Sequence, residues 1–216
     1  MGQGKLVTLE GIDGSGKTTV ATILVAEFAR RGVDVVPSRE PTDGFLGEAL
    51  KRQIRREDAN PVAEAFLFVA DHLQHVQWVR QQLAAGRTVL SDRYSDSCYA
   101  YQGAGLADVP VLGPRAMDWL IALQEPFNRP PDVVLLLDLD PEKAVARVRA
   151  RGEVIKFEEP GFLGRVRENY RKLAQRSDAY EVVPADRPAA EVAADCLARL
   201  ERRGVLPTVP RPTTGK

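Results

Sequence analysis

Gly11-Ile-Asp-Gly-Ser-Gly-Lys-Thr18 is the stretch that decides the fold of this 216-residue chain. It follows a strand-like apolar run at 6–10 and precedes a helix-like run at 17–31. The spacing Gly-x4-Gly-Lys-Thr lets successive backbone N–H groups surround phosphate oxygens, because the glycines place no Cβ in the way. The pattern predicts a P-loop, which binds a nucleoside triphosphate.

Each position of this loop has an expected part in nucleotide binding. Lys17 places a cation on the β- and γ-phosphates and Thr18 offers its hydroxyl to Mg²⁺. The helix that begins there points its positive dipole end at the anion. We therefore predict that the nucleotide-binding residues are Gly11, Ile12, Asp13, Gly14, Ser15, Gly16, Lys17 and Thr18.

Outward from the loop, short apolar runs alternate with helix-like segments. Strands are expected at 6–10, 33–39, 88–92, 133–138 and 179–183, and helices at 17–31, 61–83, 141–151, 161–176 and 189–203. Strand, helix, strand order with short connections implies a parallel sheet with right-handed crossovers. We predict an α/β fold of the P-loop NTPase type, a doubly wound parallel five-stranded sheet with helices on both faces. We expect residues 1–204 to form a single domain and 205–216 to form a disordered tail.

The charge balance and the cysteine content exclude several classes of protein. Thirty basic residues balance thirty acidic ones, so no nucleic-acid or membrane partner is expected. Cys98 and Cys196 are too few for a disulfide framework or a zinc site of usual spacing, which suits a reducing compartment. No apolar run has the length of a signal peptide core or a spanning helix. We expect a cytoplasmic protein.

Two arginine motifs narrow the class of P-loop protein. Arg39-Glu40-Pro41 ends the second predicted strand and Asp92-Arg93-Tyr94 ends the third. The carboxyl ends of parallel strands meet at one edge of a sheet, so both guanidinium groups are expected in the crevice of the P-loop. A site that brings a second phosphorylated substrate to ATP needs such arginines to neutralise the phosphates. The sequence thus favours a phosphoryl-transfer enzyme over a GTPase switch.

Four motifs in this order resemble those of the thymidylate kinase family, especially its archaeal members. They are Leu-Glu-Gly-Ile-Asp-Gly-Ser-Gly-Lys-Thr-Thr, Arg-Glu-Pro, Ser-Asp-Arg-Tyr and Ala-Tyr-Gln-Gly, and the resemblance extends from about Leu6 to Leu200. It implies transfer of the γ-phosphoryl group of ATP to dTMP, with Mg²⁺, giving dTDP and ADP. The family is usually homodimeric, and the long apolar helix from Pro61 is the candidate interface.

The resemblance also assigns residues around the phosphates. Asp13 corresponds to the acidic residue that meets the 3′-hydroxyl of the acceptor. Arg39 and Arg93 correspond to the arginines that grip the dTMP phosphate. Asp92 matches a carboxylate that either acts on Mg²⁺ or holds those arginines, and we expect it to be a metal-site residue with Thr18. Asp138 is expected to fix the loop that follows it.

Base and sugar recognition shows two departures from the usual family pattern, at His72 and Cys98. By resemblance, Phe68 stacks on thymine, although packing in the core is the alternative for a Phe on an apolar helix. His72 stands where many members use arginine to donate to the base, and a surface or core role is its alternative. Tyr170 matches the tyrosine that crowds the 2′ position. The remaining positions that match the acceptor pocket are Ser97, Tyr101 and Gln102. Cys98 replaces a residue that is commonly polar, and His75 shows no signal beyond a helix surface.

A basic segment at 147–158 looks like the mobile lid of the family. Gly14 stands where one subclass carries an arginine in the P-loop, so the cation over the transferring phosphoryl group should come from the lid. Arg149 and Arg151 are the predicted source, with Lys156 behind them. Together with Lys17, Arg39 and Arg93, they complete the predicted catalytic set.

Two other functions remain open on the sequence alone. A related kinase acting on another nucleotide or nucleoside would account for His72 and Cys98. A nucleoside kinase, however, would need a carboxylate base to accept a hydroxyl proton, whereas two arginines suit an acceptor phosphate. A non-catalytic ATP-binding regulator is the second alternative.

Overall fold

A computed structural model of the chain describes residues 4–56, 58–150 and 159–207. Its centre is a parallel five-stranded sheet in the order β2-β3-β1-β4-β5. The strands are β1 (Leu6–Glu10), β2 (Val35–Arg39), β3 (Thr88–Asp92), β4 (Val133–Asp138) and β5 (Tyr180–Pro184). β1 lies in the middle, so the loop that follows it emerges where the connections diverge to either side, the usual place of a ligand site in such sheets.

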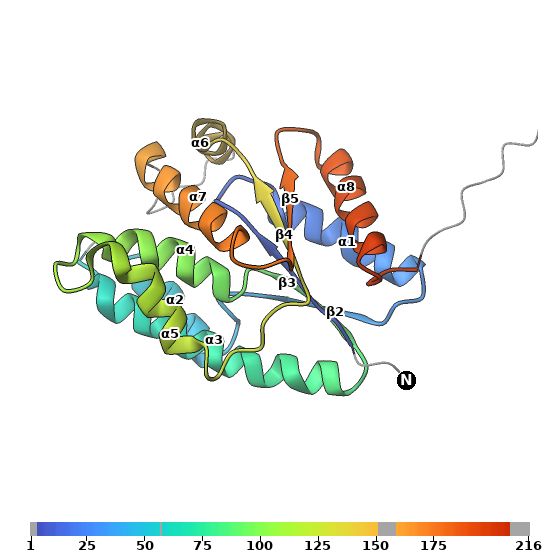
Figure 1. Ribbon diagram of the computed structural model, residues 1–216, viewed down its shortest axis with the longest axis horizontal. Coiled ribbons are helices and arrows are strands. Elements are labelled where there is room, and N and C mark those ends of the chain that lie inside the picture. Colours follow the sequence, from blue (N-terminus) through green and yellow to red (C-terminus); the bar gives the residue numbers. More distant parts are fainter. Residues whose placement is uncertain (1–3, 57, 151–158, 208–216) are drawn as a thin grey trace, which may run out of the picture.

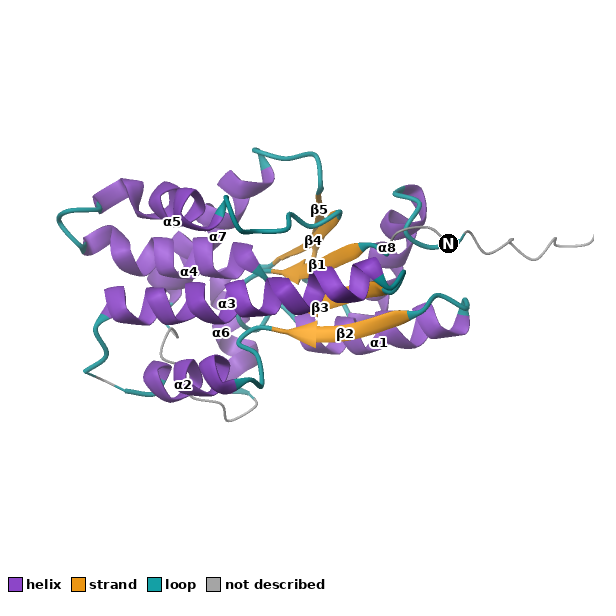
Figure 2. Cartoon of the chain, turned by 90° about the horizontal axis from the view of Figure 1, so that it is seen from below, coloured by secondary structure: helices purple, strands orange, loops and turns teal. Residues whose placement is uncertain are grey.

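Helices cover both faces of the sheet (Figure 1). One face carries α1 (Lys17–Arg30) and α8 (Ala189–Arg202), and the other carries α3 (Pro61–Ala84), α4 (Ser95–Gly105) and α7 (Pro160–Ala174). The elements α2 (Phe45–Ile54), α5 (Ala116–Gln124) and α6 (Pro141–Arg149) complete the set, with short 3₁₀ turns at Leu106–Asp108 and Gly113–Arg115. In Figure 2 the strands point to the left, towards the end of the molecule where α2 and α6 lie. That end carries the site.

Register aligns the carboxyl ends of the central strands. Leu9 of β1 lies opposite Asp92 of β3 and opposite Leu135 of β4, and Arg39 of β2 also lies opposite Asp92. β1 is buried along its whole length, as expected for a strand covered on both faces. The P-loop and the two arginine motifs therefore start from one edge.

Local sequence explains how the longest helix, α3, begins. The Asn60 side chain accepts hydrogen bonds from the backbone N–H groups of Val62 (2.9 Å) and Ala63 (3.1 Å), and Pro61 occupies the first turn. This is the preferred chemistry of a helix start. From this fixed start the helix brings His75 to Ser38 of β2.

The sheet and the five predicted helices are confirmed, with ends shifted by a few residues. Three helices, α2, α4 and α5, were not predicted. The predicted boundary at 204 is too early, because Val205 and Leu206 are buried in the main hydrophobic cluster. Residues 208–216 of the predicted tail lie outside the described part of the chain. Among the described helices, none is both long and apolar enough to cross a membrane.

Candidate active site

The P-loop has no room for side chains at two of its glycines. Gly11 has φ +139°, and a Cβ there would lie 2.5 Å from the carbonyl oxygen of Leu137. Gly14 has φ +83°, and its Cβ would lie 2.4 Å from the carbonyl oxygen of Ala144 in α6. Both φ values belong to the region that favours glycine. An arginine at position 14 is therefore excluded by the close approach of α6.

Lys17 is a buried cation in the first turn of α1. Its Nζ donates hydrogen bonds to the carbonyl oxygens of Gly11 (2.9 Å) and Ile12 (3.0 Å). Burial, and then the nearby Arg93 guanidinium, lower the pKa of Lys17 to about 8. A phosphate group that enters the loop would favour the charged form of this amine, because an opposite charge offsets desolvation.

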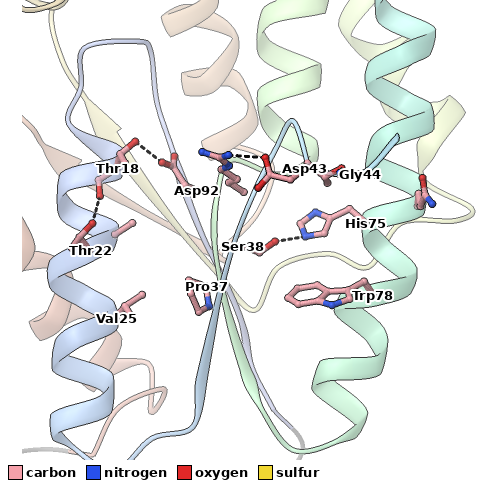
Figure 3. A pocket seen from close by; sticks show the side chains of 14 residues that line it. Thr18, Thr22, Val25, Pro37, Ser38, Asp43, Gly44, His75, Trp78 and Asp92 are labelled. Atoms are coloured by element: carbon pink, nitrogen blue, oxygen red, sulfur yellow. Dashed lines mark hydrogen bonds and ion pairs between the residues drawn. The ribbon is translucent and has the colours of Figure 1, made fainter. Parts of the chain in front are cut away.

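Thr18 and Asp92 form a pair suited to Mg²⁺. The Thr18 hydroxyl donates to Oδ2 of Asp92 at 2.7 Å (Figure 3). The other carboxylate oxygen, Oδ1, is buried and has no hydrogen-bond partner among the described residues. A hydroxyl beside a carboxylate oxygen with no other partner is the oxygen-rich environment that Mg²⁺ prefers, so these residues fit the ion.

Arg93 lies at the centre of the site. Its guanidinium pairs with Oδ1 of Asp13, donates to Oγ of Ser97 (2.9 Å) and lies over the ring of Tyr101 at 5.1 Å. Burial opposes ionisation of Asp13, but Arg93 and then Lys17 lower the pKa of this carboxyl. Asp13 is held from its other side as well, because its backbone N–H donates to the Tyr101 hydroxyl at 2.8 Å. Two predicted acceptor residues, Asp13 and Arg93, are thus in contact.

The crevice beside the P-loop has a volume of about 620 Å³. Arg39 and Arg93 both line it, together with Lys17, as predicted from the strand ends. Arg39 is exposed and paired with Oδ1 of Asp43 at 2.6 Å, so its guanidinium has room to turn. Lys51 of α2 also lines the crevice. This fourth cation was not predicted, because α2 was not predicted.

A larger cavity of about 770 Å³ adjoins the crevice along the edge strand β2 (Figure 3). α1 forms one wall through Thr22 and Val25, and α3 forms the other through His75 and Trp78. The floor is β2 at Pro37. Thr18, Arg39 and Asp92 line both spaces, so the cavity opens directly beside the phosphate crevice.

Three predicted acceptor residues converge behind Arg93. Ser97 of α4 and Tyr170 of α7 are buried, and their hydroxyl oxygens lie 2.9 Å apart. Tyr101 lies edge-on to Tyr170, with ring centres 6.4 Å apart. The hydroxyl groups of Ser97 and Tyr170 both donate to the Glu10 carboxyl group, which the sequence analysis did not single out.

The predicted residues Gln102 and Phe68 lie on α4 and α3, respectively. Nε2 of Gln102 donates to the carboxylate of Glu64 at 3.1 Å, which fixes the amide orientation. Its Oε1 is buried without a partner among the described residues. Phe68 is half-buried and packs against the hydrophobic core. Stacking of its ring on a base stays a prediction.

The two imidazole groups differ from expectation. His72 is fully buried: its Nδ1 contacts Glu40 (2.9 Å) and its Nε2 contacts Oδ1 of Asn128 (3.1 Å). Both ring nitrogens are engaged, so this placement does not support direct donation to a base. His75 was predicted to be on the helix surface, which is wrong: it is buried and bonds Glu40 (2.7 Å) and Ser38 (2.5 Å). The histidines fix the Arg39-Glu40-Pro41 turn instead.

This histidine cluster predicts a pH dependence of stability. Burial opposes protonation of His72, but the Glu40 carboxylate raises its pKa, and Glu40 in turn has a pKa lowered to about 2. Because the folded pKa of His72 is raised, its contribution is fully present below the unfolded value of about 6.5. That contribution is lost as pH rises through the folded value. The Asp96 carboxyl group also raises the pKa of His72. The Tyr94 ring packs edge-on against the His72 ring.

The free energy of unfolding in urea, compared between wild type and His72→Gln at pH 5.5, 7 and 9, measures this effect. The glutamine amide can form hydrogen bonds but does not ionise. We expect the stability advantage of wild type to shrink with rising pH by about 1.5–3 kcal/mol, the contribution of a hydrogen bond to a charged group. An advantage that stays constant over this pH range would contradict an imidazolium at position 72.

Asp138 is held by two arginines of α7. Arg167 donates to Oδ1 (2.6 Å) and Oδ2 (2.9 Å), and Arg171 donates to Oδ2 (3.1 Å). Burial opposes ionisation, but Arg167 lowers the pKa of Asp138. A carboxylate with both oxygens engaged in this way fixes α7 to the end of β4, whereas the sequence led us to expect that it would fix the loop that follows it.

The predicted lid is described only at its start. Arg149 is the last residue of α6 and is exposed, and Val148 beside it lines the phosphate crevice. Arg151 and Lys156 lie outside the described residues.

Cys98 stands where the resemblance leads one to expect a polar residue. It is buried, and Nε2 of the buried Gln124 lies 3.5 Å from its Sγ.

Comparison with known proteins bears on the identity of this site. The family model of thymidylate kinase matches residues 9–196. A "Probable thymidylate kinase" of Halobacterium salinarum is 45% identical over 197 residues, 90% of this chain and 94% of that protein. Proteins of the same name from Methanosarcina mazei and Pyrobaculum calidifontis are 45% and 40% identical, over 88% and 91% of this chain and 92% and 95% of their own lengths. With its P-loop and two crevice arginines, the chain belongs to the thymidylate kinase family of nucleoside-monophosphate kinases.

Proposed function

We propose that this protein transfers the γ-phosphoryl group of ATP to dTMP, giving dTDP and ADP. One observation carries the proposal beyond family membership: Lys17 of the P-loop and two arginines from different strands line a single crevice of about 620 Å³. A hydrolase or a switch needs one phosphate site, whereas this crevice offers cations for two sets of phosphates.

Catalysis in this crevice is mainly positioning and charge neutralisation. The acceptor phosphate is already a nucleophile at neutral pH, so no general base is required. Lys17 binds the β- and γ-phosphates, while Arg39 and Arg93 bind the phosphate of dTMP. Asp13 orients the acceptor through its 3′-hydroxyl and keeps Arg93 in place through the ion pair described above.

Mg²⁺ is the proposed metal, and Thr18 and Asp92 are the residues that would hold it. When bound, the ion neutralises charge on the β- and γ-phosphates of ATP. The buried Oδ1 of Asp92, which has no partner in the described structure, supports this assignment. The alternative role of Asp92, holding the crevice arginines, has no hydrogen bond to support it among the described residues.

The cation that covers the transferred phosphoryl group is proposed to come from the lid. Gly14 cannot carry an arginine because of the carbonyl of Ala144. Arg149 stands at the end of α6 next to the crevice wall, and Arg151 follows two residues later. Closure of these side chains over ATP would exclude water and suppress hydrolysis.

Base and sugar recognition is proposed to involve the residues behind Arg93. Oε1 of Gln102 is an acceptor available for the N3–H of thymine, because the Glu64 contact orients its Nε2 away. Phe68 stacks on the base, and Tyr170 limits space at the 2′ position. Ser97 and Tyr101 hold the arginine and the P-loop, while His72 acts through the turn that carries Arg39.

A homodimer in the cytoplasm is the proposed state of the protein. The family resemblance suggests the dimer, and α3 offers a surface in which Phe66 is 50% exposed and lies edge-on to Trp119 of α5. A reducing compartment agrees with the two cysteines, Cys98 and Cys196, which are both free and buried.

An ATP-coupled assay with dTMP, dUMP, dCMP, dGMP and thymidine tests the proposal. We expect dTMP to give the highest kcat/KM of the set. Equal rates with all four monophosphates would overturn the base assignment. Faster phosphorylation of thymidine than of dTMP would favour a nucleoside kinase.

A further inference from the structure

Glu10 is a fully buried carboxyl group at the end of β1, directly before the P-loop. Acidic side chains are rarely buried in this way unless each oxygen is bonded. Oε1 accepts a hydrogen bond from the backbone N–H of Tyr94 at 2.8 Å. Oε2 accepts from the hydroxyl groups of Ser97 (2.6 Å) and Tyr170 (2.9 Å). One side chain therefore joins β1, the start of α4 and α7.

The contacts of Glu10 bear directly on the conformation of Arg93. Arg93 has φ +73°, a left-handed conformation that is uncommon for a residue with a side chain and that the surrounding contacts must hold in place. Neighbouring hydrogen bonds hold it: Arg93 N–H to Leu9 O (3.0 Å), Ser91 Oγ to Arg93 O (2.7 Å), and Tyr94 N–H to Glu10. Glu10 thus fixes the backbone immediately after Arg93.

The second oxygen of Glu10 acts on the guanidinium end of the same arginine. Oε2 accepts a hydrogen bond from the Ser97 hydroxyl, and Oγ of Ser97 accepts one from Nη1 of Arg93 at 2.9 Å. Tyr170, on the same oxygen, packs edge-on to Tyr101, whose ring lies under the Arg93 guanidinium. Backbone and side chain of Arg93 are therefore both set by one carboxyl group.

We propose that Glu10 is a positioning residue for acceptor binding, which sets the orientation of Arg93 through Tyr94, Ser97 and Tyr170. The inference rests on the proposed function, because it assigns Arg93 to the acceptor phosphate. Glu10 is not a catalytic base: it is fully buried, and both of its oxygens are bonded. Its contribution is geometric, and misplacement of a reacting group by about 1 Å can lower the rate about 10²-fold.

Steady-state kinetics and binding of Glu10→Gln and Glu10→Ala test this role. We expect kcat/KM for dTMP to fall about 10²-fold in Glu10→Ala, with a raised KM for dTMP and an unchanged KM for ATP. Glu10→Gln keeps an acceptor oxygen and the shape of the side chain, so it should recover part of the loss. If Glu10→Ala does not fold, Glu10→Gln alone must still show the rise in KM for dTMP and not for ATP.

Asp195→Asn is the matched control, because Asp195 is a part-buried carboxyl of α8, on the other face of the sheet, and bonds Arg199 (2.9 Å) and Arg187 (3.0 Å). We expect it to lower the melting temperature without an acceptor-specific change in KM. Parallel increases of both KM values in the Glu10 variants, or unchanged kinetics, would overturn the inference. Wild-type assays separate the two claims: absence of dTMP kinase activity in wild type contradicts the proposed function itself.

Discussion

Arg93→Ala lowers kcat/KM for dTMP by about 10³-fold or more, and ATP binding remains. An arginine that neutralises charge in phosphoryl transfer contributes on this scale. The Arg93 guanidinium is held in place by an ion pair to Asp13 and a hydrogen bond to Ser97. Coupled-enzyme kinetics and nucleotide titration by calorimetry measure the two quantities separately.

The variant also leaves the Asp13 carboxylate without its partner. We expect a loss of stability of about 1–3 kcal/mol, as for other groups whose partner is removed in a partly buried site. Arg93→Lys should be nearly as impaired as Arg93→Ala, because an ammonium group lacks the forked geometry that binds phosphate. Arg30→Ala, at an exposed ion pair of α1, is the matched control and should be unchanged in activity. Retention of more than a tenth of wild-type kcat/KM in Arg93→Ala would refute the assignment.

Lys17→Met is expected to reduce kcat by about 10²–10³-fold, the loss typical when one preorganised charge donor is removed. The melting temperature, in contrast, should not fall. Burial lowers the pKa of Lys17 to about 8, so the charged amine disfavours folding below that pH. The melting temperature of Lys17→Met at pH 7 should therefore equal or exceed that of wild type.

The pH dependence of this stability difference provides a further check. As pH rises above 8, folded Lys17 loses its proton and the cost of its buried charge disappears, so the two melting temperatures should converge. Lys172→Met, an exposed position of α7, is the control and should show neither effect. A wild-type level of kcat in Lys17→Met, or a melting temperature well below that of wild type at pH 7, would contradict the account.

Features that are local in sequence could be predicted. The P-loop, the strands that precede it and follow it, and the capped start of α3 at Asn60-Pro61 each depend on neighbouring residues. α4 could not be found in this way, because ten of its eleven residues are buried and no polar stripe marks its helical period. α2 was missed as well: Gly44 precedes its first residue and Gly47 lies in its first turn, where a Cβ would lie 2.1 Å from Thr42 O, and glycine is a poor helix former.

Roles that depend on tertiary contacts were the ones missed. Lys51 reaches the crevice only because α2 packs on α3. His72 and His75 look like helix residues of no fixed role until Glu40 is seen between them. Glu10 is the last residue of the strand before the P-loop and carries no local signal. Its role could be inferred only from its hydrogen bonds in the folded chain, one of them to Tyr170, 160 positions away.

Transfer of label from ATP to the acceptor tests the central claim most directly. Incubation of the protein with Mg²⁺, dTMP and ATP labelled in its γ-phosphate should place the label in the β-phosphate of dTDP, with one dTDP formed for each ADP. This result is predicted because one crevice holds cations for both phosphate groups. Label recovered as inorganic phosphate, or ADP formed at the same rate without dTMP, would contradict the account.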